Sequence, residues 1–251
     1  MIDRETDLLA IERAAVRGWP ATVVESIDGW VARSSSGGSV RANSVAALTW
    51  TGIDLASSIA RVVAFYRARH ATPCFTVSDA SAPPDLDKAL DRAGWHRAPD
   101  HVTMAKWVGG GHPSVSPAMV VRQSDTPDEG WYDVYLQGLS ADRRAIAPEI
   151  VERVPRPRVF FSAVRDGRVI GSGLSLIDGA LASVQCMATL AEARRTGAAT
   201  AILAAIEATA RKHGCRRIYL QADGTNTPAI ELYTRFGFTV VGRYHTRALT
   251  G

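Results

Sequence analysis

Cysteine is scarce in this sequence: Cys74, Cys186 and Cys215 are the three thiols among 251 residues. An odd number of cysteines argues against a disulfide framework, and their positions do not repeat the short spacings that hold zinc. The six histidines share no ligand spacing either. We therefore expect reduced thiols and no metal site.

Long apolar runs are also missing. No stretch approaches the roughly 18 residues that a membrane-spanning helix needs. The first residues, Met1-Ile2-Asp3-Arg4-Glu5, are charged and lack the apolar core of a secretion signal. With 46% hydrophobic and 22% charged residues, the composition is that of an ordinary globular protein. We expect no membrane association and a cytoplasmic location.

A continuous basic stripe is the third absence. The net charge is +4 and the pI is near 9.2, yet arginines alternate with acids along the chain. The densest basic clusters are at 153–158, 194–195 and 211–217. Nucleic-acid binding stays open as a lesser alternative, because a phosphate-bearing small ligand would use this positive charge equally well.

The segment 109–117 is the clearest linker, because it is rich in Gly, Ser and Pro and has no periodicity. It separates a domain at 1–108 from a domain at 118–251. In the first domain, patterning predicts a helix within 1–20, strands at 22–27, 30–33 and 40–48, a helix at 54–69, a strand at 74–77, a helix at 84–93 and a strand at 102–107.

The second domain repeats much of this order. Patterning predicts a strand at 119–122, a helix at 128–139, a helix at 141–153 broken around Pro148, strands at 159–164, 169–177 and 181–190, a helix at 194–213, a strand at 217–222, a helix at 228–236 and a strand at 239–245. We interpret the shared order as an internal duplication, with two unrelated halves as the alternative. Either reading gives an α+β protein.

The loop Arg194-Arg195-Thr196-Gly197-Ala198-Ala199 leads from a buried strand directly into a helix. Backbone N–H groups at a helix N-terminus lack intrahelical partners, and the helix dipole adds positive potential, so this is a predicted anion site. Gly197 allows the backbone to approach a phosphate closely. The equivalent loop of the first half carries Asp54, which would repel phosphate.

A second motif, Asn226-x-x-Ala229-x-x-Leu232-Tyr233-x-x-x-Gly237-Phe238, follows the next strand. Asn226 is a good N-cap and Gly237 a good helix stop. Together with Arg-x-x-Gly-x-Ala, in this order across strand, helix, strand and helix, the motif closely resembles the GNAT N-acyltransferase superfamily. The resemblance covers about 118–251 as a complete copy, and the first half is similar to a truncated, degenerate copy of the same fold. It implies a tandem α+β fold with a mixed, mostly antiparallel sheet flanked by helices.

The resemblance implies an acetyl-CoA-dependent N-acetyltransferase that acts by direct attack of a primary amine in a ternary complex. Tyr233 would protonate the departing CoA thiolate. Acetyl-CoA would be held by the backbone of the preceding strand, by the loop and by the second motif, which comprise Met187, Ala188, Thr189, Arg194, Arg195, Thr196, Gly197, Ala198, Ala199, Thr200, Asn226 and Tyr233. A CoA-binding regulatory module without acyl transfer is the competing reading.

The acyl acceptor, a small-molecule or peptide amine, is not named by the sequence. A lysine-like amine with a pKa of about 10.4 must lose a proton before it can attack. Candidates for the base are Glu152, Asp178, Asp223 and, through water, Gln185, but no spacing favours one of them. The base and the oligomeric state therefore remain open.

Overall fold

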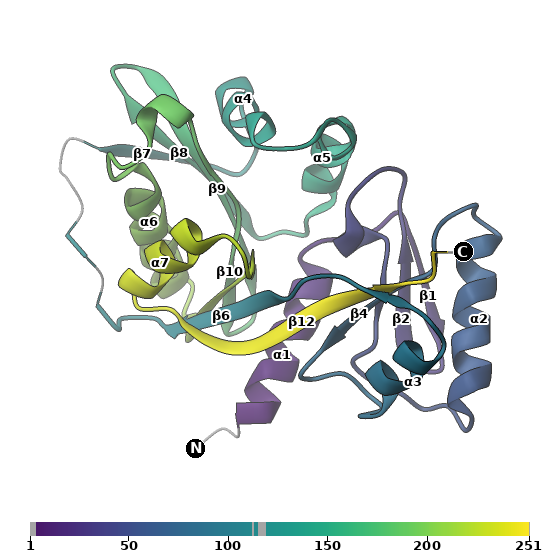
Figure 1. Ribbon diagram of the computed structural model, residues 1–251. Helices are drawn as coiled ribbons and strands as arrows, with labels where there is room; N and C mark the ends of the chain where they lie inside the picture. Colours follow the sequence, from purple (N-terminus) through teal and green to yellow (C-terminus); the bar gives the residue numbers. More distant parts are fainter. Residues whose placement is uncertain (1–3, 112, 115–118, 251) are drawn as a thin grey trace. The chain divides into compact units, whose positions relative to one another are not determined.

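The computed structural model describes residues 4–111, 113–114 and 119–250 (Figure 1). The chain forms two compact units. Unit 1 contains the residues up to Val102, together with Asp223–Thr225 and the chain from Val241 onward; unit 2 contains Thr103–Ala222 and Asn226–Val240.

Unit 1 is built on a sheet in the order β1-β2-β3-β4-β12, in which β3 and β4 are parallel and the other neighbours antiparallel. Its elements are α1 (Arg4–Arg17), β1 (Val23–Ile27), β2 (Trp30–Ser34), η1 (Val40–Ala42), β3 (Val45–Ala46), α2 (Leu55–Arg67), β4 (Cys74–Ser78), α3 (Leu86–Arg92) and β5 (His96–Arg97). Trp30, Phe75 and Trp95 stand in edge-to-face contact at 5.2 and 5.4 Å in its core.

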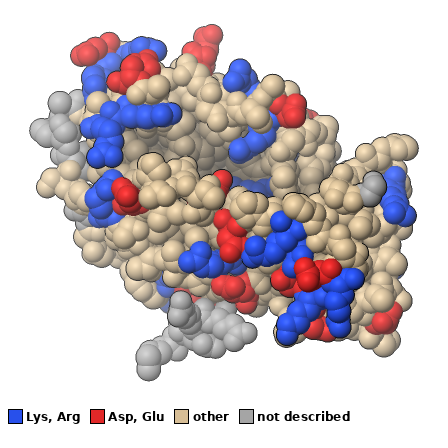
Figure 2. Space-filling view, viewed as in Figure 1, with Lys and Arg blue, Asp and Glu red and all other residues tan. Residues whose placement is uncertain are grey.

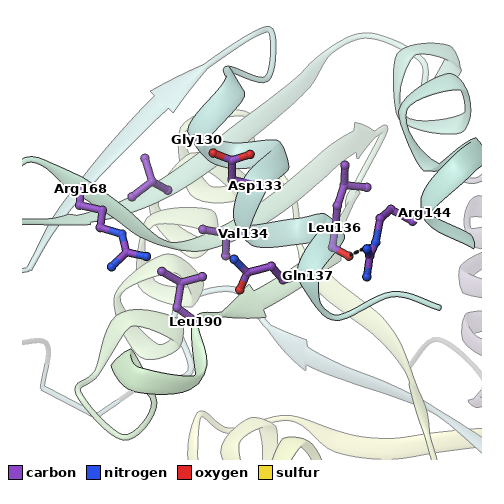
Figure 3. A pocket seen from close by; sticks show the side chains of 9 residues that line it. Gly130, Asp133, Val134, Leu136, Gln137, Arg144, Arg168 and Leu190 are labelled. Carbon is purple, nitrogen blue, oxygen red and sulfur yellow. Dashed lines mark hydrogen bonds between the residues drawn. The ribbon is translucent and has the colours of Figure 1, made fainter. Parts of the chain in front are cut away.

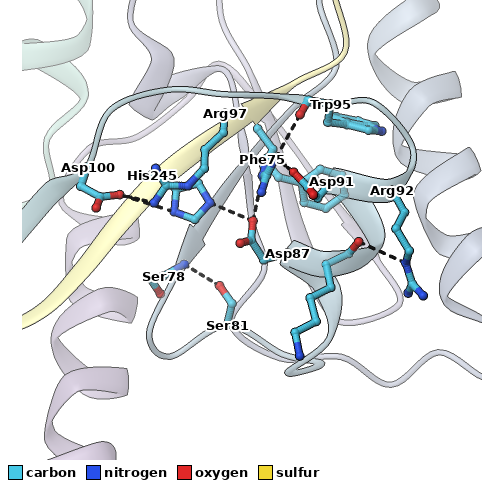
Figure 4. A network of polar contacts seen from close by, with 12 residues as sticks. Phe75, Ser78, Ser81, Asp87, Asp91, Arg92, Trp95, Arg97, Asp100 and His245 are labelled. Atoms are coloured by element: carbon cyan, nitrogen blue, oxygen red, sulfur yellow. Dashed lines mark hydrogen bonds and ion pairs between the residues drawn. The ribbon is translucent and has the colours of Figure 1, made fainter.

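The end of β12 (Thr239–Ala248) is attached to α3 by charged side chains (Figure 4). His245 Nε2 lies 2.8 Å from Asp87 Oδ1, and Arg247 donates to Asp87 and Asp91 at 2.8 and 2.7 Å. Burial raises the pKa of Asp87, but the hydrogen bonds and charges of Arg247 and His245 outweigh it and leave this pKa below its ordinary value. The network therefore keeps Asp87 ionised and holds the last strand of unit 1 in place.

Unit 2 contains a sheet in the order β7-β8-β9-β10-β11-β6. Strands β7 to β10 are antiparallel, while β10 and β11 are parallel. Its elements are β6 (His101–Trp107), β7 (Val120–Ser124), α4 (Glu129–Gln137), α5 (Ala141–Arg153), β8 (Arg158–Arg165), β9 (Arg168–Asp178), β10 (Leu181–Thr189), η2 (Ala191–Ala193), α6 (Ala198–Lys212), β11 (Arg217–Asp223) and α7 (Thr227–Arg235).

Two helices pack on this sheet at β9. Helix α6 packs closely on β9 at Gly173. A side chain at this position would clash with α6, because its Cβ would lie 2.6 Å from Cγ2 of Ile202. Trp131 of α4 is fully buried and donates its indole N–H to the Gly173 carbonyl at 2.9 Å. Small residues in β9 therefore set how closely the helices approach the strand that neighbours β10.

The predicted α+β class and the mostly antiparallel sheet are confirmed. Two predicted details are wrong. Helix α5 is continuous over Ala141–Arg153 with Pro148 inside it, rather than broken there. The third strand expected at 40–48 is shorter: Val40–Ala42 forms a 3-10 turn and β3 covers just Val45–Ala46.

The compact units differ from the division expected at residues 108 and 118. The boundary between them falls inside β6, after Val102, and inside β12, after Val240. Each of these strands therefore contributes residues to both units. Of the linker expected at 109–117, residues 112 and 115–117 lie outside the described residues.

Among the helices of the described residues, none is both long and apolar enough to cross a bilayer.

Candidate functional site

Strand β10 separates from β11 halfway along its length. The two strands pair in parallel through Leu181–Val184 and Arg217–Leu220, while β10 continues to Thr189. On its other side, the register with β9 shifts between Gln185 and Ala188. Within the described chain, the backbone of Met187–Thr189 therefore has no strand partner on the β11 side, and those groups are available to a ligand.

The loop after β10 ends at an uncapped helix. Gly197 is the N-cap of α6, with φ 91° and ψ 0°, and no side chain of the described residues bonds to the helix end. Thr196 instead donates to the Ala193 carbonyl at 2.7 Å. Arg194 and Arg195 are exposed, Ala198 is buried, and Ala199 and Thr200 are half-buried. The first backbone N–H groups of α6 are therefore not hydrogen-bonded to any side chain of the described residues, and they remain available to a ligand.

The electrostatics of this helix end favour an anion. The first turn of α6 contains no acidic residue. The nearest acid in sequence, Glu192, is paired with Arg168 at 3.2 Å. The equivalent helix of unit 1 differs, because Asp54 caps α2 by accepting from the Ser57 N–H at 2.8 Å, and hydrogen bonds from Ser57 hold the Asp54 pKa below its usual range. A carboxylate therefore occupies the end of α2 and none occupies the end of α6.

Helix α7 positions the two residues of the second motif that are expected to contact acetyl-CoA, Asn226 at its N-cap and Tyr233 within it. Asn226 is exposed and caps the helix by accepting from the Ala229 N–H at 3.3 Å. Tyr233 is 8% exposed, and its ring lies edge-on to Phe238 at 5.9 Å. Burial raises the pKa of the Tyr233 hydroxyl to about 12. Tyr233 therefore stays protonated at neutral pH and can act as a proton donor.

A cavity of about 470 Å³ lies between α4, the start of β9 and the end of β10 (Figure 3). Asp133 and Gln137 of α4 contribute polar groups, and Val134, Val169 and Leu190 contribute apolar walls. Its two arginines are engaged elsewhere: Arg144 donates to the Leu136 and Leu139 carbonyls at the end of α4, and Arg168 pairs with Glu192. The cavity thus adjoins the segment that leads into the loop predicted to bind an anion.

The four candidate bases have different surroundings. Asp223 accepts from Thr225 N and Oγ1 at 2.8 and 2.7 Å, and these hydrogen bonds lower its pKa. Gln185 is buried and donates to Ser183 Oγ at 3.0 Å, and Asp178 is half-buried. Glu152 is exposed near the end of α5. Among the described residues, no three His, Cys, Asp or Glu side chains are grouped as metal ligands.

Two features of unit 2 escaped the sequence analysis. Lys106 and Glu207 form a buried ion pair at 2.6 Å. A signal existed, because Glu207 lies one turn after Leu203 on the apolar stripe of α6, where a charge is unexpected. Tyr132 of α4 has a buried hydroxyl that makes no hydrogen bond with the described residues, and no sequence pattern distinguished it from other aromatic residues.

Comparison with known proteins gives the same fold and adds the family. The family model described as "Probable histone acetyltransferase Rv0428c C-terminal" matches residues 6–247. "Uncharacterized N-acetyltransferase YobR" of Bacillus subtilis (strain 168) is 29% identical over 248 residues, which cover 96% of this chain and 98% of that protein.

Two solved structures extend the comparison at the level of the fold. A GCN5-related N-acetyltransferase from Kribbella flavida superposes with a TM-score of 0.72 at 15% identity, covering 97% of this chain and 96% of that one. A tandem GNAT protein from the clavulanic acid biosynthesis pathway gives 0.59 at 19% identity, covering 77% and 69%. The chain belongs to the family of the Rv0428c C-terminal region and is an N-acetyltransferase of the GNAT superfamily.

Proposed function

We propose that this chain transfers the acetyl group of acetyl-CoA to a primary amine by direct attack in a ternary complex, and that unit 2 holds the site. The observation that carries the proposal is the uncapped N-terminus of α6 at Gly197, which no acidic side chain of its first turn opposes. A diphosphate is the ligand group that best matches several convergent backbone N–H donors and a helix dipole.

Three groups of residues in unit 2 would hold the diphosphate and the pantetheine arm of acetyl-CoA. The N–H groups of Gly197 to Thr200 would hold the diphosphate, with Arg194 and Arg195 adding positive charge from the surface. The backbone of Met187, Ala188 and Thr189, which has no strand partner on the β11 side within the described chain, would bind the amide groups of the pantetheine arm. Asn226, exposed at the start of α7, would contact the same arm while it caps the helix.

Tyr233 would serve as the general acid. When the amine attacks the thioester carbon, a C–N bond forms and the C–S bond breaks, so the sulfur departs with negative charge. A phenol that burial keeps protonated can give its proton to that thiolate. Tyr233 makes no hydrogen bond with the described part of the chain, and its hydroxyl is therefore uncommitted before substrate binds.

The face of the molecule drawn in Figure 2 does not favour a nucleic-acid ligand. In the space-filling view, blue and red side chains are interspersed rather than separated into areas of one sign (Figure 2). Nucleic-acid binding usually draws on a continuous basic face. A lysine-bearing peptide belongs in the acceptor screen, because the matching family is described as a probable histone acetyltransferase.

The test combines an acceptor screen with Tyr233→Phe. Free CoA thiol is measured while primary alkylamines, aminoglycosides and lysine-bearing peptides are offered, and CoA affinity is measured by calorimetry. We expect kcat of Tyr233→Phe to fall by about 100-fold or more while its CoA affinity stays within about twofold of the wild type.

The control is Tyr244→Phe, which removes another buried phenol, in unit 1, and should leave turnover unchanged. Tight CoA binding without thiol release for any amine would instead support a CoA-binding module. A protein that does not bind CoA would remove the proposal altogether.

A further inference from the structure

The cavity of about 470 Å³ lies against α4, β9 and the end of β10, and the described residues that line it all belong to unit 2 (Figure 3). None of the residues proposed to hold acetyl-CoA or to protonate its thiolate is among them. Small-molecule sites usually have volumes of about 300–1,000 Å³. The proposed acetyl transfer therefore makes no use of a cavity that has the volume of a ligand site.

Helix α4 presents to this cavity two polar side chains that the protein itself does not use. The Asp133 carboxylate is exposed, and within the described chain it takes part in no ion pair and no hydrogen bond. The side-chain amide of Gln137 is exposed as well and has no hydrogen-bond partner among the same residues. Because the two residues are four positions apart, they lie on one face of the helix. This face offers a negative charge and a neutral hydrogen-bonding group to a ligand.

Arg168, at the start of β9, supplies a positive charge. Its Nη2 pairs with Glu192 at 3.2 Å, and its Nε and Nη1 have no side-chain or carbonyl acceptor in the described part of the chain. Arg144, the other arginine of the cavity, is committed, because its Nε and Nη2 donate to carbonyls at the end of α4. Figure 3 shows the Arg168 guanidinium and the Gln137 amide extending toward Leu190. An anionic group of a ligand placed there would accept from both.

The rest of the wall is largely apolar. Val134 of α4, Val169 of β9 and Leu190 line the cavity, and all three are buried. Leu190 is held against β9, because its N–H donates to the Ile170 carbonyl at 3.0 Å. A pocket with apolar walls and a few polar groups selects a ligand with an apolar body and matching charges. Here the matching charges are an ammonium group for the carboxylate of α4 and a carboxylate for the guanidinium of β9.

We propose that this cavity binds a free α-amino acid with an aliphatic or aromatic side chain. The ammonium group pairs with Asp133, and the carboxylate accepts from Arg168 and from the amide of Gln137. The side chain packs on the two valines and on Leu190. No bond forms or breaks, and acetyl-CoA occupies its own site at the same time. The site is therefore independent of the proposed acetyl transfer.

The first experiment measures the binding of L-leucine and L-phenylalanine to the full chain by calorimetry, with and without saturating CoA. We expect a Kd on the order of 1 mM or tighter under both conditions. Two analogues of leucine each lack one charge, since 4-methylpentanoate has no ammonium group and 3-methylbutylamine has no carboxylate. Both should bind at least about tenfold more weakly than leucine when measured by ligand-observed NMR.

The second experiment removes one charge of the protein at a time. Asp133→Asn should weaken leucine binding about tenfold and leave 4-methylpentanoate binding unchanged, because that analogue has no ammonium group. Arg168→Gln should weaken the binding of both and spare 3-methylbutylamine. The matched control Glu129→Gln neutralises another exposed carboxylate of α4, one that does not line the cavity, and should change none of these affinities.

The proposal is overturned if neither amino acid binds, if leucine and its two analogues bind equally well, or if both charge-removing variants bind leucine as the wild type does. Loss of leucine binding on saturation with CoA would place the amino acid in the acetyl-CoA site and would overturn it too. A chain that binds leucine but no CoA would refute the proposed acetyl transfer alone, because the measurement without CoA still decides whether this cavity is a site.

Discussion

The ammonium group of Lys106 lies 2.6 Å from Oε2 of Glu207, and the two side chains are 2% and 1% exposed. The other carboxylate oxygen of Glu207 accepts from the Gly109 N–H at 2.8 Å, and Lys106 donates to the Gly111 carbonyl at 3.1 Å. Lys106 also lies 4.7 Å from the centre of the Phe236 ring. One buried pair thus connects β6, the segment after it, α6 and the end of α7.

Replacing Lys106 with Met should destabilise the protein by about 3–5 kcal/mol, because the buried Glu207 carboxylate loses its nearest counter-charge and keeps the exposed Arg211 at 3.9 Å. The free energy of unfolding, measured by urea denaturation, checks this. The double variant Lys106→Met with Glu207→Met should recover part of the loss, since it removes both charges.

The exposed pair Arg235–Glu231, at 3.5 Å, provides the control for this measurement. Arg235→Met should change the free energy of unfolding by less than about 1 kcal/mol. Equal small effects at Lys106 and Arg235 would show that the interior pair is far better hydrated than its geometry indicates.

The end of α6 can be tested with one added charge. Gly197→Asp places a carboxylate at the N-cap, as Asp54 does in unit 1, whereas Gly197→Asn adds a side chain of the same shape without charge. Both residues tolerate positive φ better than most, so the strain is matched. We expect CoA to bind Gly197→Asp at least about tenfold more weakly than Gly197→Asn. Equal affinities would place the diphosphate elsewhere.

The pKa of Tyr233 predicts a stability change in alkali. Its folded value of about 12 exceeds the unfolded value of about 10, so its contribution is fully present below pH 10 and is lost as the pH rises toward 12. The wild type should lose about 1–2 kcal/mol more than Tyr233→Phe between pH 9 and 11. Denaturant titrations of both proteins measure this difference, and parallel curves would contradict the burial of the phenol.

Local signals made much of this fold predictable. The caps Asp54, Asp128 and Asn226 begin helices where they were expected, because capping depends on residues three positions away. The strand before Gly197 and the helix after it were predicted from their apolar patterning, although α6 begins at Ala198 rather than at 194. Which of these residues touch acetyl-CoA is still a proposal.

Features that depend on contacts between residues far apart in the chain could not be predicted from the sequence. The register shift at Cys186 and the early end of the β10–β11 pairing depend on which strands become neighbours, and periodicity within one strand does not carry that information. The pairing of Lys106 with Glu207 joins residues far apart in the chain. Pro148 was expected to break α5, yet the helix continues through it to Arg153, with Ile150 and Val151 buried.

The division of β6 and β12 between the two units has a consequence for synthesis on the ribosome. Residues from Val241 onward follow nearly everything else in the chain, yet β4, made much earlier, pairs with Tyr244–Ala248. Unit 1, most of which is synthesised first, therefore has an unpaired edge at β4 until the end of β12 has been translated. During that interval β4 is a site where chaperones can bind or where nascent chains can pair wrongly.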